Sequence, residues 1–218
     1  MNGLVHTLLE RVLFVLPLWV SLSVHEWAHA RTAFALGDDT AQKQGRMTLD
    51  PLAHVDWVGT VLLPLLGIPF GWAKPVPVDT TSFSGNVSMR TGLLLVALAG
   101  PLSNVALALA LLGLDVVVAR VAPDLAIERP LLAHVLDFAL ATNVMLALFN
   151  LLPFGPLDGS RIVDGLVPFE RRALWDRIGP SIGIALLVVF FFVGGPHVLA
   201  SVASVRDGLH GWASGVDR

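Results

Sequence analysis

The sequence has no cysteine among its 218 residues and few charged residues. Without thiols the chain cannot form disulfides, iron–sulfur clusters or thiolate zinc sites, so any metal site must use histidine and carboxylate ligands. Asp, Glu, Lys and Arg make up 14% of the chain, against roughly 25% in soluble domains. Because the net charge is −3 and there is no basic run, we expect no nucleic-acid partner.

Hydrophobic residues are abundant instead, at 55% of the chain with a mean hydropathy of +0.73. We predict an all-α polytopic membrane protein with about four transmembrane helices, namely a three-helix core and a C-terminal helix. Residues 1–218 form a single membrane-embedded domain in this interpretation, with the core at about 4–165 and the additional helix at about 180–204. The start of the chain lacks the features of a signal peptide, so we expect it to be retained. The apolar blocks lie at 4–36, 91–119, 131–152 and 182–203.

A shorter apolar segment, "WVGTVLLPLLGIPFGWA" at 57–73, is interrupted by Pro64 and Pro69. A spanning helix needs about 20 apolar residues, so this segment favours a re-entrant element. In the "KPVPV" that follows, two prolines prevent a helix and two valines favour extended backbone. We therefore expect a re-entrant, partly extended hairpin between the first two spanning helices.

The segment His25-Glu26-Trp27-Ala28-His29 has the pattern H-E-x-x-H. On a helix, residues four apart lie on one face, so both imidazoles can reach one ion while the glutamate acts as a general base. At this composition the pattern is expected by chance in about 0.004 chains. Ionisable groups at membrane depth are functional by default.

Catalytic zinc needs a third protein ligand. Asp158 is a candidate because it follows the end of a spanning block, where prolines and glycines break the helix. Non-helical backbone at membrane depth is tolerated only where protein or a water-filled cavity covers it. The alternatives that remain open are Asp115, Asp137, His54 and His134.

Two separated motifs, "HEWAHA" at 25–30 and "NLLPFGPLDG" at 150–159, resemble the site-2 protease family of intramembrane zinc metalloproteases, peptidase family M50. Three further segments resemble its compact prokaryotic (bacterial and archaeal) branch: "GRMTLDPLAHVD" at 45–56, "GWAKPVPV" at 71–78 and "AGPLSN" at 99–104.

The resemblance implies that His25, His29 and Asp158 bind Zn²⁺ and that Glu26 activates water. Asn150 matches the family's asparagine ahead of L-D-G and would bind the substrate backbone or help hold the oxyanion. Its alternative role is a hydrogen bond at a helix C-terminus. His54 matches a histidine of the branch that would contact metal, substrate or a carboxylate.

Topology follows from one condition, that His25 and Asp158 reach the same ion. The helices that carry or precede them must then run parallel, with the helix between them antiparallel, so residues 37–90 begin and end on one side. That side carries eight Lys and Arg residues and the other side five, so we expect the active-site end to lie nearer the cytoplasmic side of the cell membrane. Both termini then lie outside. We also expect Asn104, Asn143 and Asn150 to line a polar cavity at the site.

The predicted function is intramembrane zinc-dependent hydrolysis of peptide bonds within or near transmembrane segments of membrane proteins, single-pass ones in particular. A helical substrate must unwind before attack, and Gly71–Val78 is the candidate edge that holds it extended. The alternatives are a metal ion transporter, which leaves Glu26 without a role, and an inactive family member acting as a membrane binding scaffold. The lipid bilayer is a further partner, and a homo-oligomer is left open.

Overall fold

The computed structural model describes residues 2–66, 71–122 and 124–214, and these are largely helical, with no strand among them. Pro69 and Arg218, which the sequence arguments used, lie outside the described residues. The α-helices are α1 (Asn2–Ala35), α2 (Thr40–Lys43), α3 (Leu63–Leu65), α4 (Met89–Val121), α5 (Leu125–Glu128), α6 (Pro130–Asn150), α7 (Asp158–Leu166), α8 (Arg172–Val189) and α9 (Gly195–Ser214). Short 3₁₀ or π-helical turns are η1 (Pro51–His54), η2 (Trp57–Leu62), η3 (Thr80–Ser82), η4 (Phe169–Arg171) and η5 (Phe190–Gly194).

Three helices among the described residues are long and apolar enough to cross a membrane: α4, α6 and the continuous Arg172–Trp212 helix formed by α8, η5 and α9. They confirm the prediction of an all-α polytopic membrane protein. The first predicted block is also helical, as α1, although α1 is not one of these three. The last helix is longer than the expected 182–203, since Pro180 is accommodated inside α8, as prolines often are in transmembrane helices.

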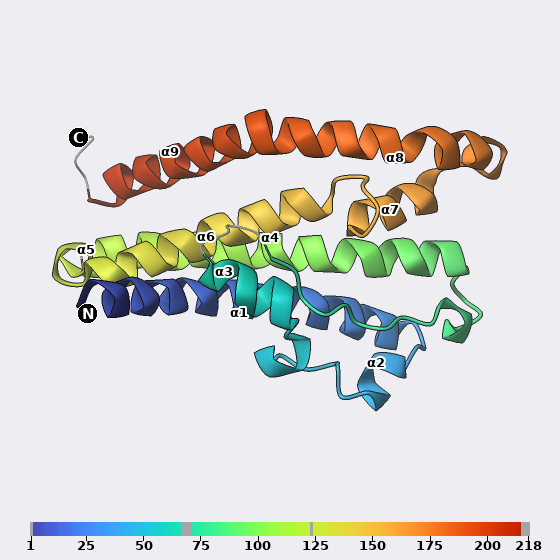
Figure 1. Cartoon of the computed structure of the whole chain (residues 1–218), viewed down its shortest axis with the longest axis horizontal. Coiled ribbons are helices and arrows are strands. Elements are labelled where there is room, and N and C mark those ends of the chain that lie inside the picture. Colours follow the sequence, from blue (N-terminus) through green and yellow to red (C-terminus); the bar gives the residue numbers. More distant parts are fainter. Residues whose placement is uncertain (1, 67–70, 123, 215–218) are drawn as a thin grey trace.

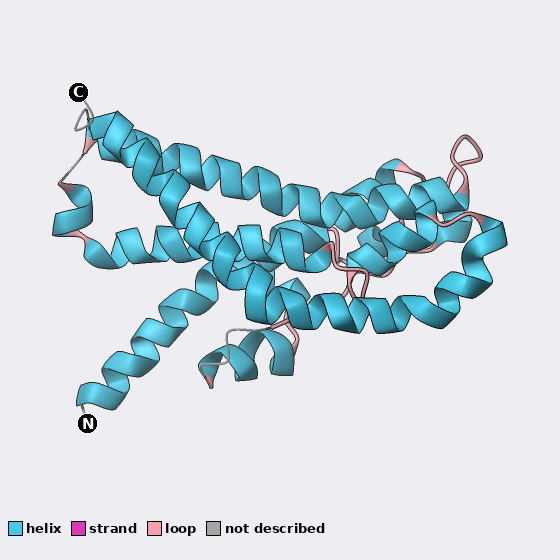
Figure 2. Cartoon of the chain, turned by 90° about the horizontal axis from the view of Figure 1, so that it is seen from above, coloured by secondary structure: helices cyan, strands magenta, loops and turns pink. Residues whose placement is uncertain are grey.

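The helices alternate in direction along the bundle (Figure 1). α1 and α6 run the same way, α4 runs against both of them, and α8–α9 returns so that both termini lie at one end (Figure 1). α4 packs against α1, α6 and α7, and so occupies the centre of the core. Toward the N-terminus, α1 diverges from the other helices (Figure 2). The parallel first and third helices are the arrangement that the predicted site requires.

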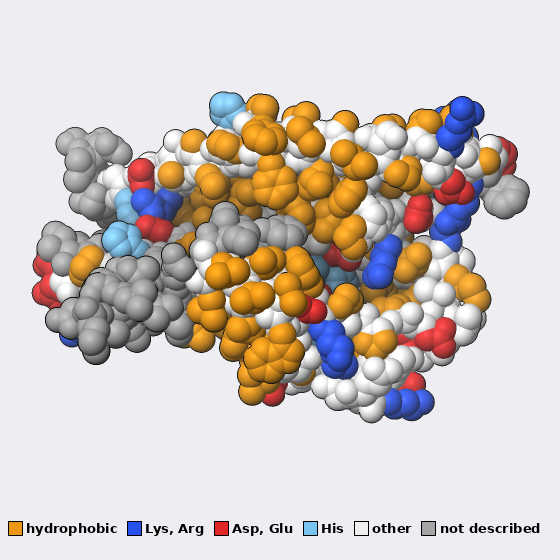
Figure 3. All heavy atoms as spheres, viewed as in Figure 1, with side chains coloured by type: hydrophobic (Ala, Val, Ile, Leu, Met, Phe, Trp, Pro, Cys, Tyr) orange, Lys and Arg blue, Asp and Glu red, His pale blue; other side chains and the backbone are white. Residues whose placement is uncertain are grey.

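Alanine is the commonest apolar residue in the interior of this bundle. Ala30, Ala33 and Ala97 are fully buried, whereas large apolar side chains such as Leu109 and Phe192 are 64% and 80% exposed. Apolar side chains cover much of the surface over α8–α9 and α3, and charged side chains gather toward the end opposite the termini (Figure 3). Close helix packing through small residues, with large apolar residues facing outward, is typical of membrane proteins.

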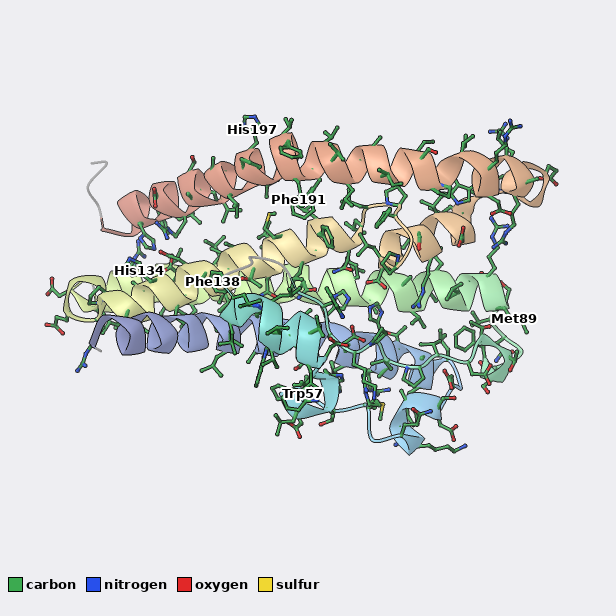
Figure 4. All side chains as sticks on the ribbon, viewed as in Figure 1. Trp57, Met89, His134, Phe138, Phe191 and His197 are labelled. Atoms are coloured by element: carbon green, nitrogen blue, oxygen red, sulfur yellow. The ribbon has the colours of Figure 1, made fainter. Side chains whose placement is uncertain are left out.

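The segment between α1 and α4 enters the bundle's flank and returns to the same end (Figure 1). Trp19 of α1 donates its indole N–H to the carbonyl of Thr60 in η2 at 2.8 Å. A Cβ added to Gly71 would lie 2.3 Å from the carbonyl oxygen of Gly59, so the two arms meet backbone to backbone. Trp57 is 78% exposed and points away from the bundle (Figure 4). The segment has an apolar outer surface and a return arm with no regular helix over 71–79, and its re-entry into the membrane stays a prediction.

The C-terminal helix contacts the core near its middle and again near the chain termini. Phe191 of η5 points toward α6 (Figure 4), with its ring 5.9 Å from that of Phe149. Nearer the termini, Arg206 of α9 forms an ion pair with Asp137 of α6.

Candidate metal centre

Three buried ligand groups converge from two distant parts of the chain. His25 and His29 lie one turn apart on α1, and Asp158 is the first residue of α7. The two Nε2 atoms are 3.0 Å apart, and Asp158 Oδ2 lies 3.1 Å from that of His25 and 3.2 Å from that of His29. In the described part of the chain this is the group of histidines and carboxylates able to hold a metal ion.

The alternative third ligands lie elsewhere. Asp115 contacts His210 at 2.7 Å, and Asp137 pairs with Arg206. His134 is exposed and lies toward the end of the bundle that carries the termini (Figure 4). Asp115 and Asp137 therefore link α9 to the core helices α4 and α6.

The hydrogen bond of His29 fixes its tautomer. Its Nδ1 lies 2.7 Å from the carbonyl oxygen of Val96 on α4. A carbonyl can only accept, so Nδ1 carries a proton, and in the neutral ring Nε2 presents a lone pair to the site.

The tautomer of His25 is fixed through two buried amides. Its Nδ1 lies 2.7 Å from Oδ1 of Asn104. The Nδ2 of Asn104 donates to the Ser21 carbonyl at 3.3 Å and to Oδ1 of Asn143 at 2.9 Å, and Asn143 donates onward to the carbonyl of Ala139. Because the carbonyls only accept, both amide orientations are determined, and His25 Nδ1 must be the donor to Asn104. In the neutral ring its Nε2 also presents a lone pair.

The donor set fits a divalent cation. Two imidazole Nε2 atoms and a carboxylate oxygen face one another within 3.2 Å, an arrangement that needs a proton or a metal cation between them. Zinc binds nitrogen and oxygen at about 2.0–2.2 Å, so two ligands of a tetrahedral ion lie about 3.3 Å apart. The observed separations are close to that value, and the N₂O set suits Zn²⁺.

Two glycines let the backbone come close enough to build this centre. A Cβ on Gly100 of α4 would lie 2.4 Å from Nε2 of His29 and 2.6 Å from Cε1 of His25. A Cβ on Gly159 would lie 2.3 Å from the carbonyl oxygen of Leu152. Gly100 thus lets α4 pack directly on the imidazoles, and Gly159 lets the start of α7 close against the end of α6.

Glu26 is held by the return arm of the hairpin. Its Oε2 accepts a hydrogen bond of 2.9 Å from the backbone N–H of Val76. One carboxylate oxygen is therefore fixed, and the other has no protein donor among the described residues. The predicted base and the predicted substrate edge are in direct contact.

The structure does not bring Asn150 or His54 into contact with the three ligands. Asn150 donates its side-chain amide to the carbonyl of Leu146 at 3.0 Å, which is the alternative helix-end hydrogen bond. His54 is buried, with Nε2 2.9 Å from the carbonyl of Thr48 and with Nδ1 lacking a partner in the described part of the chain. Their proposed roles stay predictions.

Sequence comparisons agree with this chemistry. The family model for peptidase family M50 matches residues 116–194, which include Asp158 but not the histidines. A Bacillus subtilis protein named "Putative zinc metalloprotease YwhC" is 42% identical over 188 residues, covering 85% of this chain and 83% of the relative. "Putative zinc metalloprotease Rip2" of Mycobacterium tuberculosis is 36% identical over 158 residues, 71% of this chain and 58% of the relative. The protein of the same name from Mycolicibacterium smegmatis is 34% identical over 164 residues, 74% of this chain and 61% of the relative. No solved structure matches the chain.

Proposed function

The chain belongs to peptidase family M50, and on that premise we propose that it is an intramembrane zinc metalloendopeptidase acting within or near transmembrane segments of membrane proteins. The observation that carries the proposal is that His25 and His29 meet Asp158, which lies at least 129 residues further along the chain, with Glu26 next to His25 on α1. The fold is that of a multi-pass membrane protein, and we infer that this centre lies within the membrane, where soluble substrates have little access.

Each residue of the centre has a separate task. When bound, Zn²⁺ would polarise the scissile carbonyl and lower the pKa of water toward about 7. Glu26 takes the proton of the attacking water on its free oxygen and passes it to the leaving amine. Asn104 and the Val96 carbonyl hold the two imidazoles with their Nε2 atoms turned inward, as outer partners of metal-bound histidines do.

The return arm of the hairpin offers little free backbone to a substrate. The N–H of Lys74 donates to the carbonyl of His54, and that of Val76 to Glu26. Pro75 and Pro77 have no N–H. Within 74–78 of the described backbone, Val78 has the N–H without a protein acceptor. We infer that an unwound substrate pairs with this arm at Val78.

Val78→Pro removes that donor and leaves the contact between Val76 and Glu26 in place. We expect cleavage to fall because KM for a membrane substrate rises, with zinc content unchanged. The measurement is the concentration dependence of cleavage in detergent micelles. A wild-type KM in this variant would show that the arm is not part of the substrate site.

The cellular setting extends the proposal. We infer that the chain lies in the cell membrane with the active-site end toward the cytoplasm, and that single-pass proteins are its substrates in regulated intramembrane proteolysis. The excess of Lys and Arg at the active-site end supports that orientation. A transporter would need further ligands along a path, and the described residues hold one ligand group.

The direct test compares the wild type with Glu26→Gln on a single-pass substrate. Both proteins should carry about one zinc ion per chain, because Glu26 is not part of the ligand group. The variant should lose cleavage by at least about 10²-fold, the usual contribution of a general base. Cleavage by the variant at the wild-type rate would refute the assignment. Zinc flux into liposomes without cleavage would favour the transporter, and zinc binding with neither activity would favour the scaffold.

A further inference from the structure

Arg46 is a buried charged residue in the polar segment between α1 and the hairpin. Arg46 is 8% exposed, and in the described part of the chain it has no carboxylate partner and its Nε has no hydrogen-bond partner. Its Nη2 instead donates to the backbone carbonyls of Lys74 at 2.6 Å and Pro75 at 3.3 Å. Burying an arginine is unfavourable unless hydrogen bonds compensate it. The guanidinium therefore donates hydrogen bonds to two successive backbone carbonyls of the return arm.

Those two carbonyls immediately precede the N–H that holds Glu26. Lys74 is fixed further by its own N–H, which donates to the carbonyl of His54 at 2.9 Å. The prolines on both sides of Val76 restrict the backbone at φ of about −65°. Val76 is itself buried against Ala30 of α1. The path from Arg46 to the base therefore runs through a short, stiff piece of backbone.

We propose that Arg46 is a positioning residue for Glu26, acting through the N–H of Val76; this rests on the proposed function. A free glutamate side chain rotates about three torsions, and the bond from Val76 selects one orientation. With Oε2 held, the other oxygen faces the attacking water. When Arg46 is removed, the arm relaxes and the donor leaves Glu26. A misplacement of about 1 Å can lower a rate up to about 10²-fold.

The test uses Arg46→Met, which keeps the apolar stem but removes the donors. We expect kcat to fall about 10- to 100-fold with zinc content close to wild type, and KM to rise as well, because the arm that relaxes also carries the substrate-pairing N–H of Val78. Arg46→Lys should recover most of the turnover, since an ammonium can reach the same carbonyls. The matched control is Lys43→Met, which removes one positive charge from the same segment. Lys43 is exposed, and its ion-pair partner in the described part of the chain is Asp39 at the surface, so this variant should match the wild type.

Amide hydrogen exchange gives a readout that does not depend on activity. Because Pro75 and Pro77 have no amide hydrogen, a peptide covering 74–79 reports on four amides: Lys74, Val76, Val78 and Asp79. Those of Lys74, Val76 and Asp79 are hydrogen-bonded. Arg46→Met should accelerate exchange in this peptide, whereas Lys43→Met should not. Unchanged exchange in the Arg46 variant would overturn the inference.

A double-mutant cycle separates positioning from general stability. Val76→Pro removes the N–H through which Arg46 would act. Adding Arg46→Met to it should reduce kcat by less than twofold further, whereas fully additive losses would contradict the inference. If Arg46→Met fails to fold, Arg46→Gln replaces it throughout. If the wild type cleaves the substrate and the Arg46 variant is equally active, this inference is refuted and the proposed function stands. If the wild type cleaves no substrate, the proposed function is refuted as well.

Discussion

Asn104→Ala tests the buried hydrogen-bond network behind His25. The side chain of Asn104 is fully buried, and it accepts from His25 while donating to Asn143 and to the Ser21 carbonyl. The truncation leaves the Nδ1–H of His25 without a partner. The imidazole then loses the hydrogen bond that selects its tautomer and turns Nε2 toward the site.

The magnitude follows from the groups that remain. An unsatisfied buried donor costs about 1–3 kcal/mol, and loss of an outer-shell partner usually weakens metal binding by about 10- to 100-fold, or about 1.4–2.7 kcal/mol. We expect the zinc Kd to rise within this range. Folding stability should fall by a comparable amount, because Asn143 and Ser21 also lose a partner.

The assay is competition for zinc between the purified protein and a chelator of known affinity at pH 7. Ser103→Ala is the control, because its hydroxyl donates to the Gly100 carbonyl of its own helix at 2.7 Å and to neither histidine. It should bind zinc like the wild type. An Asn104→Ala protein with wild-type zinc affinity would show that the network does not orient His25.

Two glycine substitutions test the close approaches at the centre. Gly100→Ala places a Cβ 2.4 Å from Nε2 of His29, so zinc affinity should fall at least about tenfold. Its control is Gly113→Ala on the same helix, where the added Cβ meets no atom within 4 Å and the protein should bind zinc like the wild type. Gly159→Ala places a Cβ 2.3 Å from the Leu152 carbonyl and should displace Asp158, with a similar loss; Gly155→Ala, which also meets nothing within 4 Å, is its control. Both pairs are measured by chelator competition, and equal affinities within either pair would contradict the geometry.

Part of the site could be predicted from sequence because its signals are local. The i, i+4 spacing of His25 and His29 on an apolar helix gives one face, and the broken backbone before Asp158 pointed to its carboxylate. The requirement that both reach one ion also predicted the parallel helices and the hairpin that returns to its starting side. Asn104 and Asn143 were expected as polar lining, although their mutual hydrogen bonds were not.

Other features leave no readable trace in one sequence. Val96 acts through its carbonyl, which every residue has, so no side-chain pattern marks it as the partner of His29. Gly100 becomes informative only when α4 is seen against the imidazoles. Arg46 resembles any solvated arginine until the fold buries it. Each depends on contacts between distant segments, which periodicity and composition do not encode.

X-ray absorption at the zinc K-edge, on the purified wild type and on Asp158→Ala, tests most directly whether these three side chains hold one ion. We expect a wild-type shell of two imidazole nitrogens and oxygen at about 2.0–2.2 Å, without sulfur. We also expect loss of zinc or of one oxygen neighbour in the variant. A wild-type shell with fewer than two imidazoles, or an identical shell and affinity in Asp158→Ala, would contradict this ligand assignment.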